Sequence, residues 1–423
     1  MLGNSLNVFL NDKHIGILEK DGYGGVIFQY STNADRILSL SLPIQKAPFD
    51  NKQCRGFFNG LLPESEHTRI VIGKKYGINP KNDFSILQAI GYDCAGAVSF
   101  FDSYDEQTPS KYLQETYEID YTPLSENELE KFINELPQKP LATGVEDMRL
   151  SLAGAQDKTS VIVVDGQIGI PKDNVPTSHI LKPAINGFNE TIENEFICIK
   201  TAKVLGINVP DVKIGYANKT KYFLIQRYDR EIINNKIKRI HQEDFCQASN
   251  IPSAYKYQAE GGVDFKRCFE ILRVTSQPAV AINQFIQLMI FNYLIGNNDA
   301  HGKNFSILHY DNGEIKFAPA YDILCSQVYP ELSNKMAMKI GGHYKHDEIL
   351  LMPFEKLANE NDISFTQLKK IIKNQCENLP IIVEDVINSF DNKIGKDILS
   401  VVQKNCTKLL KEFWFEYKFL HFS

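Results

Sequence analysis

Short hydrophobic runs, broken by Asn-Asp and Gly pairs, characterise the first hundred positions of the chain. Such runs between turn residues are typical of strands. The pattern predicts strands over residues 7–10, 14–18, 25–30 and 95–101. Residues 84–91 favour a helix instead, so we expect the amino-terminal region to be β-rich with some helix.

A polar stretch over residues 102–122 indicates a connection between domains. The hydrophobic segment after it, residues 124–136, predicts a helix. Ser125 with Glu128 three positions later is the capping-box pattern, in which each side chain bonds a backbone N–H near the other residue. Pro137 and Pro140 then end the helix.

The pattern changes again from residue 151 onward. Strands are predicted over residues 159–164, 179–181, 213–216 and 222–227. A helix over residues 193–205, ended by Gly206, lies between the two pairs of strands. After Tyr228 the chain is expected to be mostly helical, with helices over residues 281–295, 365–374, 381–390 and 398–417.

Composition narrows the class of protein. The chain has 423 residues, 43% hydrophobic and 23% charged, which fits a globular protein of two or three domains. We expect no membrane span and no secretory signal, because the hydrophobic runs are too short. The eight cysteines form no Cys-x-x-Cys pair, which fits a reducing cytoplasm. A net charge of −6 does not indicate direct nucleic-acid binding.

The clearest chemical pattern lies in a polar loop that follows a hydrophobic helix. The loop, residues 296–304, is Gly-Asn-Asn-Asp-Ala-His-Gly-Lys-Asn, and Pro-Ala-Tyr-Asp follows at residues 319–322. Asp299, then Asn304, then Asp322 after a turn, is the spacing of a kinase catalytic loop and its metal-binding Asp. Phosphoryl transfer needs a carboxylate near the attacking hydroxyl and oxygen ligands that hold Mg²⁺ against the phosphates.

A predicted hairpin explains how these residues could meet. Asp311-Asn312-Gly313 is a strong turn signal between strands at 305–309 and 314–318. We therefore expect Asp299 to be the base or hydroxyl-orienting group, and Asn304 and Asp322 to hold Mg²⁺. The alternative, ordinary loop residues with Asp322 as a cap, is disfavoured by the preceding helix and the following hairpin.

Two segments upstream could bind the phosphates of ATP. Residues 151–159 form a Gly/Ala loop that can expose backbone N–H groups, although an ordinary loop before a strand would look similar. Lys182 ends a predicted strand and could neutralise phosphates, with Glu195 as its orienting carboxylate and Glu193 as the competitor. A solvated strand-end lysine is the alternative for Lys182.

The third segment is Gln226-Arg227-Tyr228, where the small sheet gives way to helices. A hinge at this position would bind adenine through backbone groups, while Asp229 and Arg230 could equally form a surface ion pair. The residues predicted to contact ATP are Ala153, Gly154, Ala155, Gln156, Asp157, Lys158, Lys182, Gln226, Arg227, Tyr228, His301, Gly302, Lys303, Asn304, Tyr321 and Asp322.

Together these blocks closely resemble the HipA toxins, bacterial serine/threonine kinases of toxin–antitoxin modules. The resemblance extends over nearly the whole chain. The matching blocks are residues 57–64, 91–98, 151–159, 179–182, 193–196, 242–247, 256–262, the Asp299 loop and residues 320–323.

The resemblance implies an α+β, two-lobed protein-kinase-like fold with a β-rich amino-terminal subdomain and N-lobe and a mainly helical C-lobe. The implied domains are residues 1–105, 106–228 and 229–423. Ser151 matches the serine that these kinases autophosphorylate to switch themselves off, and Lys182 matches the ATP-binding lysine. Asp322 is followed by Ile323-Leu324 rather than Phe-Gly, which departs from eukaryotic kinases and fits HipA.

The resemblance also implies partners and a cellular role. A HipB-like helix-turn-helix antitoxin would bind the chain and tether it to operator DNA, so that DNA contact is indirect. The implied substrate is a protein, an aminoacyl-tRNA synthetase of glutamyl type, and its phosphorylation would halt translation. Two alternatives remain: a small-molecule kinase of the aminoglycoside or lipid type, and an inactive kinase-like co-repressor acting with the antitoxin.

Overall fold

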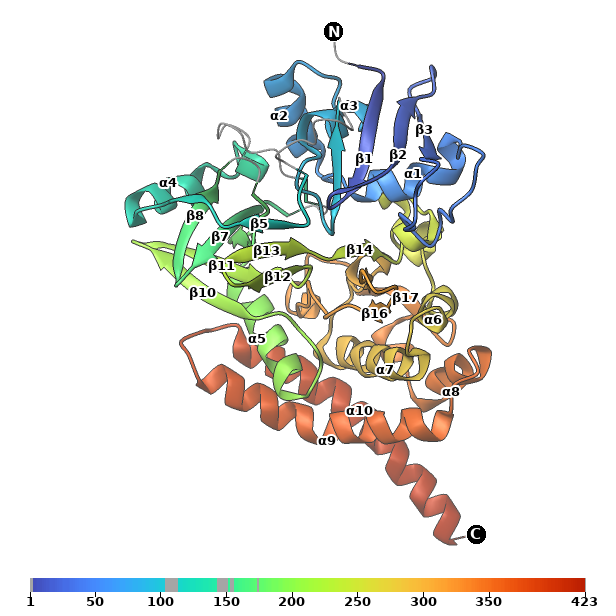
Figure 1. The fold of residues 1–423 in the computed structure, drawn as a ribbon. Helices are drawn as coiled ribbons and strands as arrows, with labels where there is room; N and C mark the ends of the chain where they lie inside the picture. Colours follow the sequence, from blue (N-terminus) through green and yellow to red (C-terminus); the bar gives the residue numbers. More distant parts are fainter. Residues whose placement is uncertain (1–2, 103–112, 143–150, 153–155, 173–174, 423) are drawn as a thin grey trace. The chain divides into compact units, whose positions relative to one another are not determined.

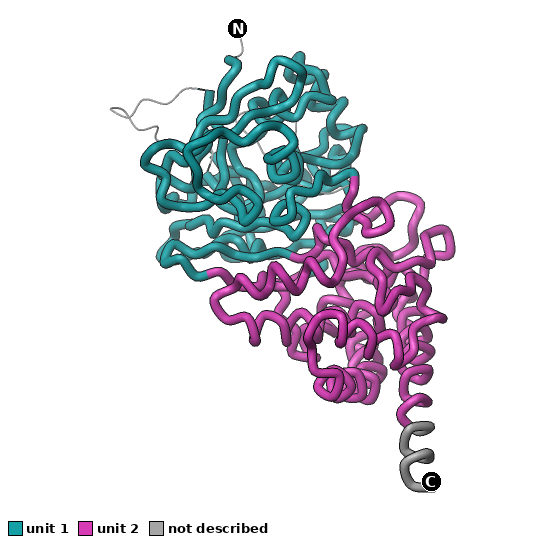
Figure 2. Tube along the Cα trace, turned by 90° about the vertical axis from the view of Figure 1, so that its right-hand side faces the viewer, with its two compact units in different colours: residues 1–183, 213–254, 306–314 teal, residues 184–212, 255–305, 315–423 magenta. Residues whose placement is uncertain are grey.

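The polypeptide passes repeatedly between two units, shown in different colours in Figure 2. The computed structural model describes residues 3–102, 113–142, 151–152, 156–172 and 175–422. Unit 1 contains Met1–Pro183, Lys213–Ala254 and Ser306–Glu314. Unit 2 contains Ala184–Val212, Tyr255–Phe305 and Ile315–Ser423.

The amino-terminal sheet of unit 1 is antiparallel, with strand order β3-β2-β1-β4 (Figure 1). Its strands are β1 (Ser5–Leu10), β2 (Lys13–Lys20), β3 (Val26–Tyr30) and β4 (Val98–Phe101). Three helices accompany it: α1 (Asn51–Gly60), α2 (Glu66–Tyr76) and α3 (Asp83–Ile90). Phe28, Phe58 and Phe100 meet in their shared core, with ring centroids 5.5 and 6.1 Å apart along the series. The predicted strands and α3 are confirmed, whereas α1 and α2 were not predicted.

A second sheet of unit 1 carries strand order β10-β11-β9-β7-β8-β6. Its strands are β6 (Tyr121–Pro123), β7 (Thr159–Val164), β8 (Gln167–Pro171), β9 (His179–Pro183), β10 (Val212–Ala217) and β11 (Thr220–Gln226). Helix α4 (Glu126–Glu135) packs on this sheet through Leu129 and Ile133. Its predicted capping box is present, because Ser125 and Glu128 each accept from the other's backbone N–H.

Unit 1 also contains strands in places where the sequence did not predict them. Strand β5 (Thr116–Glu118) lies in the polar connection and pairs with β13 (Lys236–Arg239). β13 forms a hairpin with β12 (Arg230–Ile233). The prediction of a mostly helical chain after Tyr228 is wrong here, because Asn234 and Asn235 adopt the positive φ values of 50° and 61° that a tight hairpin turn requires. Strand β14 (His241–Asp244) follows and pairs with β15 (Ser306–His309).

Unit 2 is mainly helical. Its helices are α5 (Thr191–Val204), α6 (Phe265–Arg273), α7 (Pro278–Ile295), α8 (Leu351–Glu360), α9 (Phe365–Asn388) and α10 (Gly395–Phe422). The strands assigned to it are β16 (Ile315–Phe317), β17 (Lys335–Ile340) and β18 (His343–Lys345). Helices α9 and α10 run side by side and both pack against α7 (Figure 1).

Two helices that the sequence predicts separately are joined in the structure. The separate helices predicted over 365–374 and 381–390 are one helix, α9, which continues through Pro380. Pro380 removes one backbone hydrogen bond, but Leu379 and Val383 on either side of it are fully buried and hold the two halves in line.

Among the described residues α7 alone is long and apolar enough to cross a membrane, and 61% of it is buried, as in a core helix.

Three buried histidines predict how stability depends on pH. Burial lowers the pKa of His241 to about 4 and the pKa values of His301 and His346 to about 3. Below pH ~6.5 the unfolded chain binds protons that the folded chain does not, so the free energy of unfolding falls by up to ~1.4 kcal/mol per pH unit and histidine. We expect the melting temperature to drop between pH 7 and pH 5.

The His346→Phe variant should show a shallower drop. Its ring can keep the stacking on Tyr293, whose centroid is 4.7 Å from that of His346, without a group that must stay unprotonated. His343 is exposed, and His343→Phe serves as the control that should leave the slope unchanged. Equal slopes for wild type and His346→Phe would contradict the assignment of a buried neutral imidazole.

Candidate active site

Helix α7 delivers the chain to the loop with the kinase-like spacing. The helix ends at Gly296, which has φ 80° and donates its N–H to the carbonyl groups of Asn292 and Tyr293. A side chain at this position would be strained, and its Cβ would lie 2.8 Å from Val401 on α10. The direction in which the loop leaves the helix is therefore fixed by a glycine and by packing.

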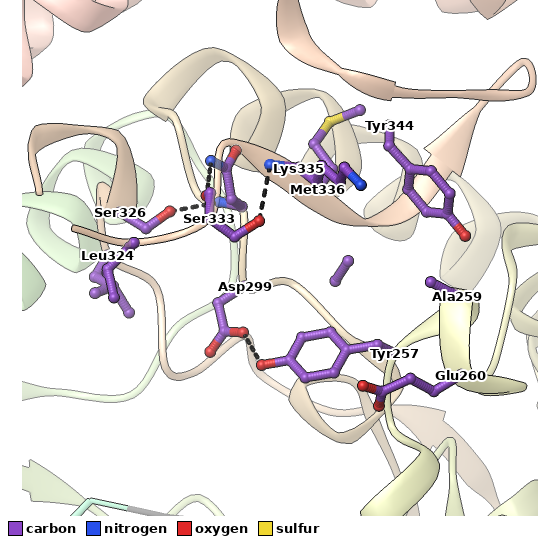
Figure 3. A pocket seen from close by; sticks show the side chains of 13 residues that line it. Tyr257, Ala259, Glu260, Asp299, Leu324, Ser326, Ser333, Lys335, Met336 and Tyr344 are labelled. Atoms are coloured by element: carbon purple, nitrogen blue, oxygen red, sulfur yellow. Dashed lines mark hydrogen bonds between the residues drawn. The ribbon is translucent and has the colours of Figure 1, made fainter. Parts of the chain in front are cut away.

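The main chain of Asp299 is held by its own loop. Its carbonyl oxygen accepts from the N–H of His301 at 2.8 Å and from Nδ2 of Asn304 at 3.0 Å. Its N–H donates to Oδ1 of Asn297 at 3.1 Å. The carboxylate is held from outside the loop, since the hydroxyl of Tyr257 donates to Oδ1 of Asp299 at 2.7 Å (Figure 3). Asp299 is thus oriented by backbone and side-chain bonds together.

The segment carrying Asp322 lies beside the same loop. The hydroxyl of Tyr321 donates to the carbonyl oxygen of Lys303 at 2.6 Å. Asp322 itself has φ 57°, an uncommon conformation for a residue other than glycine and one that clusters at functional sites. The structure therefore bonds Asn304 to Asp299 and places Tyr321, the neighbour of Asp322, against the same loop. The intervening turn is also present, since Tyr310 N–H donates to the carbonyl oxygen of Glu314 at 2.8 Å.

The oxygen atoms of Asn304 and Asp322 suit a magnesium ion. The amide nitrogen of Asn304 bonds the carbonyl of Asp299, so the amide oxygen is the atom left to act as a ligand. Mg²⁺ prefers one or two protein oxygen ligands, with phosphates and water completing an octahedron. Within the described part of the chain no cluster of three or more His, Cys, Asp or Glu residues could hold a metal.

His301 is buried in the loop and is a neutral group. Burial lowers its pKa to about 3, with the nearby charges of Lys256 and Lys303 acting in the same direction and Asp322 acting against it. Its ring packs edge-on against Tyr257 at 5.3 Å. As a neutral ring it can donate one hydrogen bond to a phosphate, but it does not add positive charge to the site.

The remaining predicted residues of unit 1 lie along the second sheet. Lys182 is on β9 opposite Phe223 and is only 5% exposed. A buried lysine is rare without a partner. Glu195, on α5 of unit 2, is 6% exposed, and its pairing with Lys182 remains a prediction. Asp157 precedes β7, and burial raises its pKa. Gln156 and Lys158 flank it, whereas Ala153, Gly154 and Ala155 lie outside the described residues.

Ser151 is enclosed within unit 1. It is fully buried, its Oγ donates to the carbonyl oxygen of Leu61 at 2.6 Å, and its N–H donates to the carbonyl oxygen of Asp93 at 3.1 Å. Neither partner is near Ser151 in sequence. In this conformation the hydroxyl is bound to the protein itself rather than presented to a nucleotide.

The predicted hinge contains a buried network of charges. The Arg227 guanidinium donates to Asp93, Thr177, Asp229 and the carbonyl of Cys94, and its N–H donates to Ser178. Arg230 binds the same two aspartates. The suggested surface ion pair of Asp229 and Arg230 is therefore wrong: both side chains are buried, because Asp93 supplies a second carboxylate that balances two arginines.

Comparisons with known proteins place the chain in a family. The profile of the HipA-like C-terminal domain matches residues 150–384, and that of the HipA N-terminal domain matches residues 6–101. Y4mE of Sinorhizobium fredii, named only as a candidate kinase, is 40% identical over 87% of this chain and 88% of its own. The chain belongs to the HipA family. HipA of Shewanella oneidensis, named a serine/threonine-protein kinase toxin, is 28% identical over 82% of this chain and 80% of its own.

A solved HipA structure confirms the fold. HipA of Shewanella oneidensis, in a complex with HipB and operator DNA, superposes with a TM-score of 0.82, at 24% identity, over 96% of this chain and 97% of that one. The predicted α+β, two-lobed kinase-like fold, with its β-rich amino-terminal part and helical carboxy-terminal part, is the HipA fold.

Two residues of this HipA-family site were not assigned a role from the sequence. Tyr257 lies 42 positions before Asp299 and in no regular spacing to it. Asn298 donates to the carbonyl of Ser333 and accepts from the N–H of Ala337, so it ties the loop to β17. The sequence block around Tyr257, which resembles the family, was the one signal that could have pointed to it.

The buried network predicts a large loss of stability for Asp93→Ala. Removing this carboxylate leaves Arg227 and Arg230 with one aspartate between them, and breaking a buried pair in this way costs about 3–5 kcal/mol. Thermal or urea unfolding of the variant would measure the change. Asp120→Ala removes the partner of an exposed pair with Lys172 and should have little effect. Similar effects of the two variants would show that the network is not structural.

Proposed function

We propose that the chain is an ATP- and Mg²⁺-dependent serine/threonine protein kinase and the toxin of a HipBA-type module. The observation that supports this best is the arrangement of Asp299, Asn304 and Asp322 around one loop in unit 2. A carboxylate with two further oxygen ligands is the set that phosphoryl transfer requires. Membership of the HipA family and the kinase names of the relatives support the same function.

The residues divide the chemistry between them. Asp299 orients the attacking serine or threonine hydroxyl and accepts its proton as the oxygen bonds to the γ-phosphorus. The bond from the γ-phosphorus to the β–γ bridging oxygen breaks, and ADP leaves. Asn304 and Asp322 would hold Mg²⁺, which neutralises phosphate charge when bound. Tyr257 keeps the carboxylate of Asp299 in place.

We propose that ATP is bound by the residues that the sequence predicts for this role. Lys182 would neutralise the phosphates, oriented by Glu195, and the loop of residues 153–158 would cover them. Main-chain groups of residues 226–228 would bind adenine. Lys182 is buried on a strand rather than solvated at its end, which favours a specific role over the solvated alternative.

Autophosphorylation of Ser151 is the proposed off-switch. A phosphorylated Ser151 could no longer donate to the Leu61 carbonyl, and a dianion would be repelled from a buried carbonyl oxygen. The modified residue would therefore have to leave its site, together with the loop that follows it. This consequence agrees with the regulatory role proposed from the resemblance.

The proposed partners follow from the family. The Shewanella HipA structure contains HipB and operator DNA, so we propose a HipB-like helix-turn-helix antitoxin here, with DNA contacted through it. The net charge of −6 is compatible with indirect contact. The proposed substrate is an aminoacyl-tRNA synthetase, of glutamyl type, and the proposed location is the cytoplasm.

Intact-protein mass after incubation with Mg-ATP tests the proposed activity. We expect one added phosphate on wild type and none on Asp299→Asn or Ser151→Ala. Addition to Ser151→Ala but not to Asp299→Asn would keep the kinase and move the regulatory residue. No addition to any of the three would contradict an autophosphorylating kinase and shift weight to a small-molecule kinase or an inactive co-repressor.

The Tyr257→Phe variant tests how the carboxylate of Asp299 is positioned. Loss of the hydroxyl removes the 2.7 Å bond to Asp299, a hydrogen bond to a charged group worth about 1.5–3 kcal/mol. We expect kcat to fall by about 10-fold or more, with the KM for ATP little changed. Steady-state kinetics on a protein substrate would measure both. An unchanged kcat would show that Asp299 is held well enough by its own loop.

A further inference from the structure

A pocket of about 510 Å³ opens directly onto the Asp299 carboxylate (Figure 3). All of its lining residues belong to unit 2. The charged groups of the lining besides Asp299 are Glu260 and Lys335. The rest of the wall is largely apolar or aromatic, with Asn298, Ser326 and Ser333 as its polar members and Tyr257, Ala259, Leu324, Leu332, Met336, Ala337 and Tyr344 as the others.

The far wall of the pocket is bonded to the catalytic loop. Asn298, the neighbour of Asp299, donates from Nδ2 to the carbonyl of Ser333 at 2.9 Å and accepts from the N–H of Ala337 at 2.8 Å. Its own N–H donates to Oγ of Ser326 at 2.8 Å. The apolar wall is thus held in a fixed position relative to the Asp299 carboxylate. A side chain that binds to this wall therefore has a defined place relative to the reacting hydroxyl.

Part of the margin of the pocket is open to solvent. Leu332 is 40% exposed, and Glu260 and Lys335 at the margin are exposed as well. Pockets for small molecules bury about 70–90% of their ligand. A depression with a buried apolar residue, Met336, and an exposed apolar margin at Leu332 suits a chain that passes over it and places one side chain inside.

We propose that this pocket binds the acceptor segment of the protein substrate. The segment is extended, and it carries an apolar side chain within two residues of the phosphorylated serine or threonine. That side chain lies against Leu332, Met336 and Tyr344 while the acceptor hydroxyl reaches Asp299. The proposal rests on the proposed protein kinase activity and adds the class of sequence that the kinase selects.

The geometry of an extended chain fits this arrangement. Residues in an extended segment advance about 3.3 Å each and point alternately to opposite sides. A neighbour one or two positions from the acceptor is therefore the residue that can enter a pocket adjoining Asp299. An apolar wall selects an apolar side chain, and such pockets discriminate by roughly tenfold or more between side chains of different size.

Degenerate peptide libraries with one central Ser or Thr, phosphorylated by the full-length chain with Mg-ATP, provide the test. For wild type we expect at least roughly tenfold enrichment of apolar residues at one position within two of the centre. Leu332→Glu should lose this preference and select Lys or Arg there, because it places a carboxylate in the wall. Ile381→Glu, at a 61% exposed position on α9 outside the pocket, is the matched control and should keep the wild-type profile.

The outcomes separate this inference from the proposed function. Mg-ATP binding and thermal unfolding of Leu332→Glu establish that the variant is folded. A flat wild-type profile, or one that Leu332→Glu leaves unchanged, would overturn the acceptor pocket while the kinase stands. Phosphate addition to the protein itself without any to the peptides would overturn recognition of an extended segment. Turnover with small hydroxyl compounds alone would overturn both the inference and the protein kinase assignment.

Discussion

The end of the buried helix α7 determines the position of the Asp299 carboxylate in the candidate active site. Helix α7 is packed against α9 and α10, and it stops at a glycine that no other residue could replace without strain and a close contact with Val401. The loop that leaves it has its main chain bonded internally at Asp299 and externally at Asn298. The position of one carboxylate therefore depends on the packing of the helical unit as a whole. A substitution in the α7–α10 contact could disturb catalysis without touching the site.

The charged side chains discussed above have different surroundings in the two units. In unit 1 two arginines and two aspartates neutralise one another inside the protein, where unpaired charges would be very costly. These charges are structural, and their hydrogen bonds are used within the network. In unit 2 the carboxylate of Asp299 faces a pocket and accepts a hydrogen bond from the hydroxyl of Tyr257.

The sequence predicted those parts of the molecule that depend on local spacing. Asp299, Asn304 and Asp322 lie in one short stretch of chain around a recognisable Asp-Asn-Gly turn, and the structure bonds Asn304 to Asp299 and places the neighbour of Asp322 against their loop. Regular strands and the capped helix α4 were predicted for the same reason. The hairpin at Asn234-Asn235 was not predicted although its signal is local, because the helical pattern of the segments downstream is stronger than that of two asparagines at a turn.

Features that depend on distant contacts could not be predicted in this way. Whether Arg227 and Arg230 are on the surface depends on Asp93, more than a hundred positions earlier. Continuation of α9 through Pro380 depends on its burial against other helices. Tyr257 reaches Asp299 from a position 42 residues earlier, with helices α6 and α7 between them. In each case the deciding partner is found only after the chain has folded.

Under the proposed autophosphorylation, the enclosure of Ser151 would delay self-inactivation. Its two hydrogen bonds to Leu61 and Asp93 are each worth about 0.5–1.5 kcal/mol, so the segment would be released for only a small share of the time. A kinase that must first release this serine would modify itself more slowly than it modifies a substrate that arrives with its hydroxyl exposed. The delay between action and self-inactivation would then be set by two hydrogen bonds in the β-rich unit, far along the sequence from the residues that carry out the transfer.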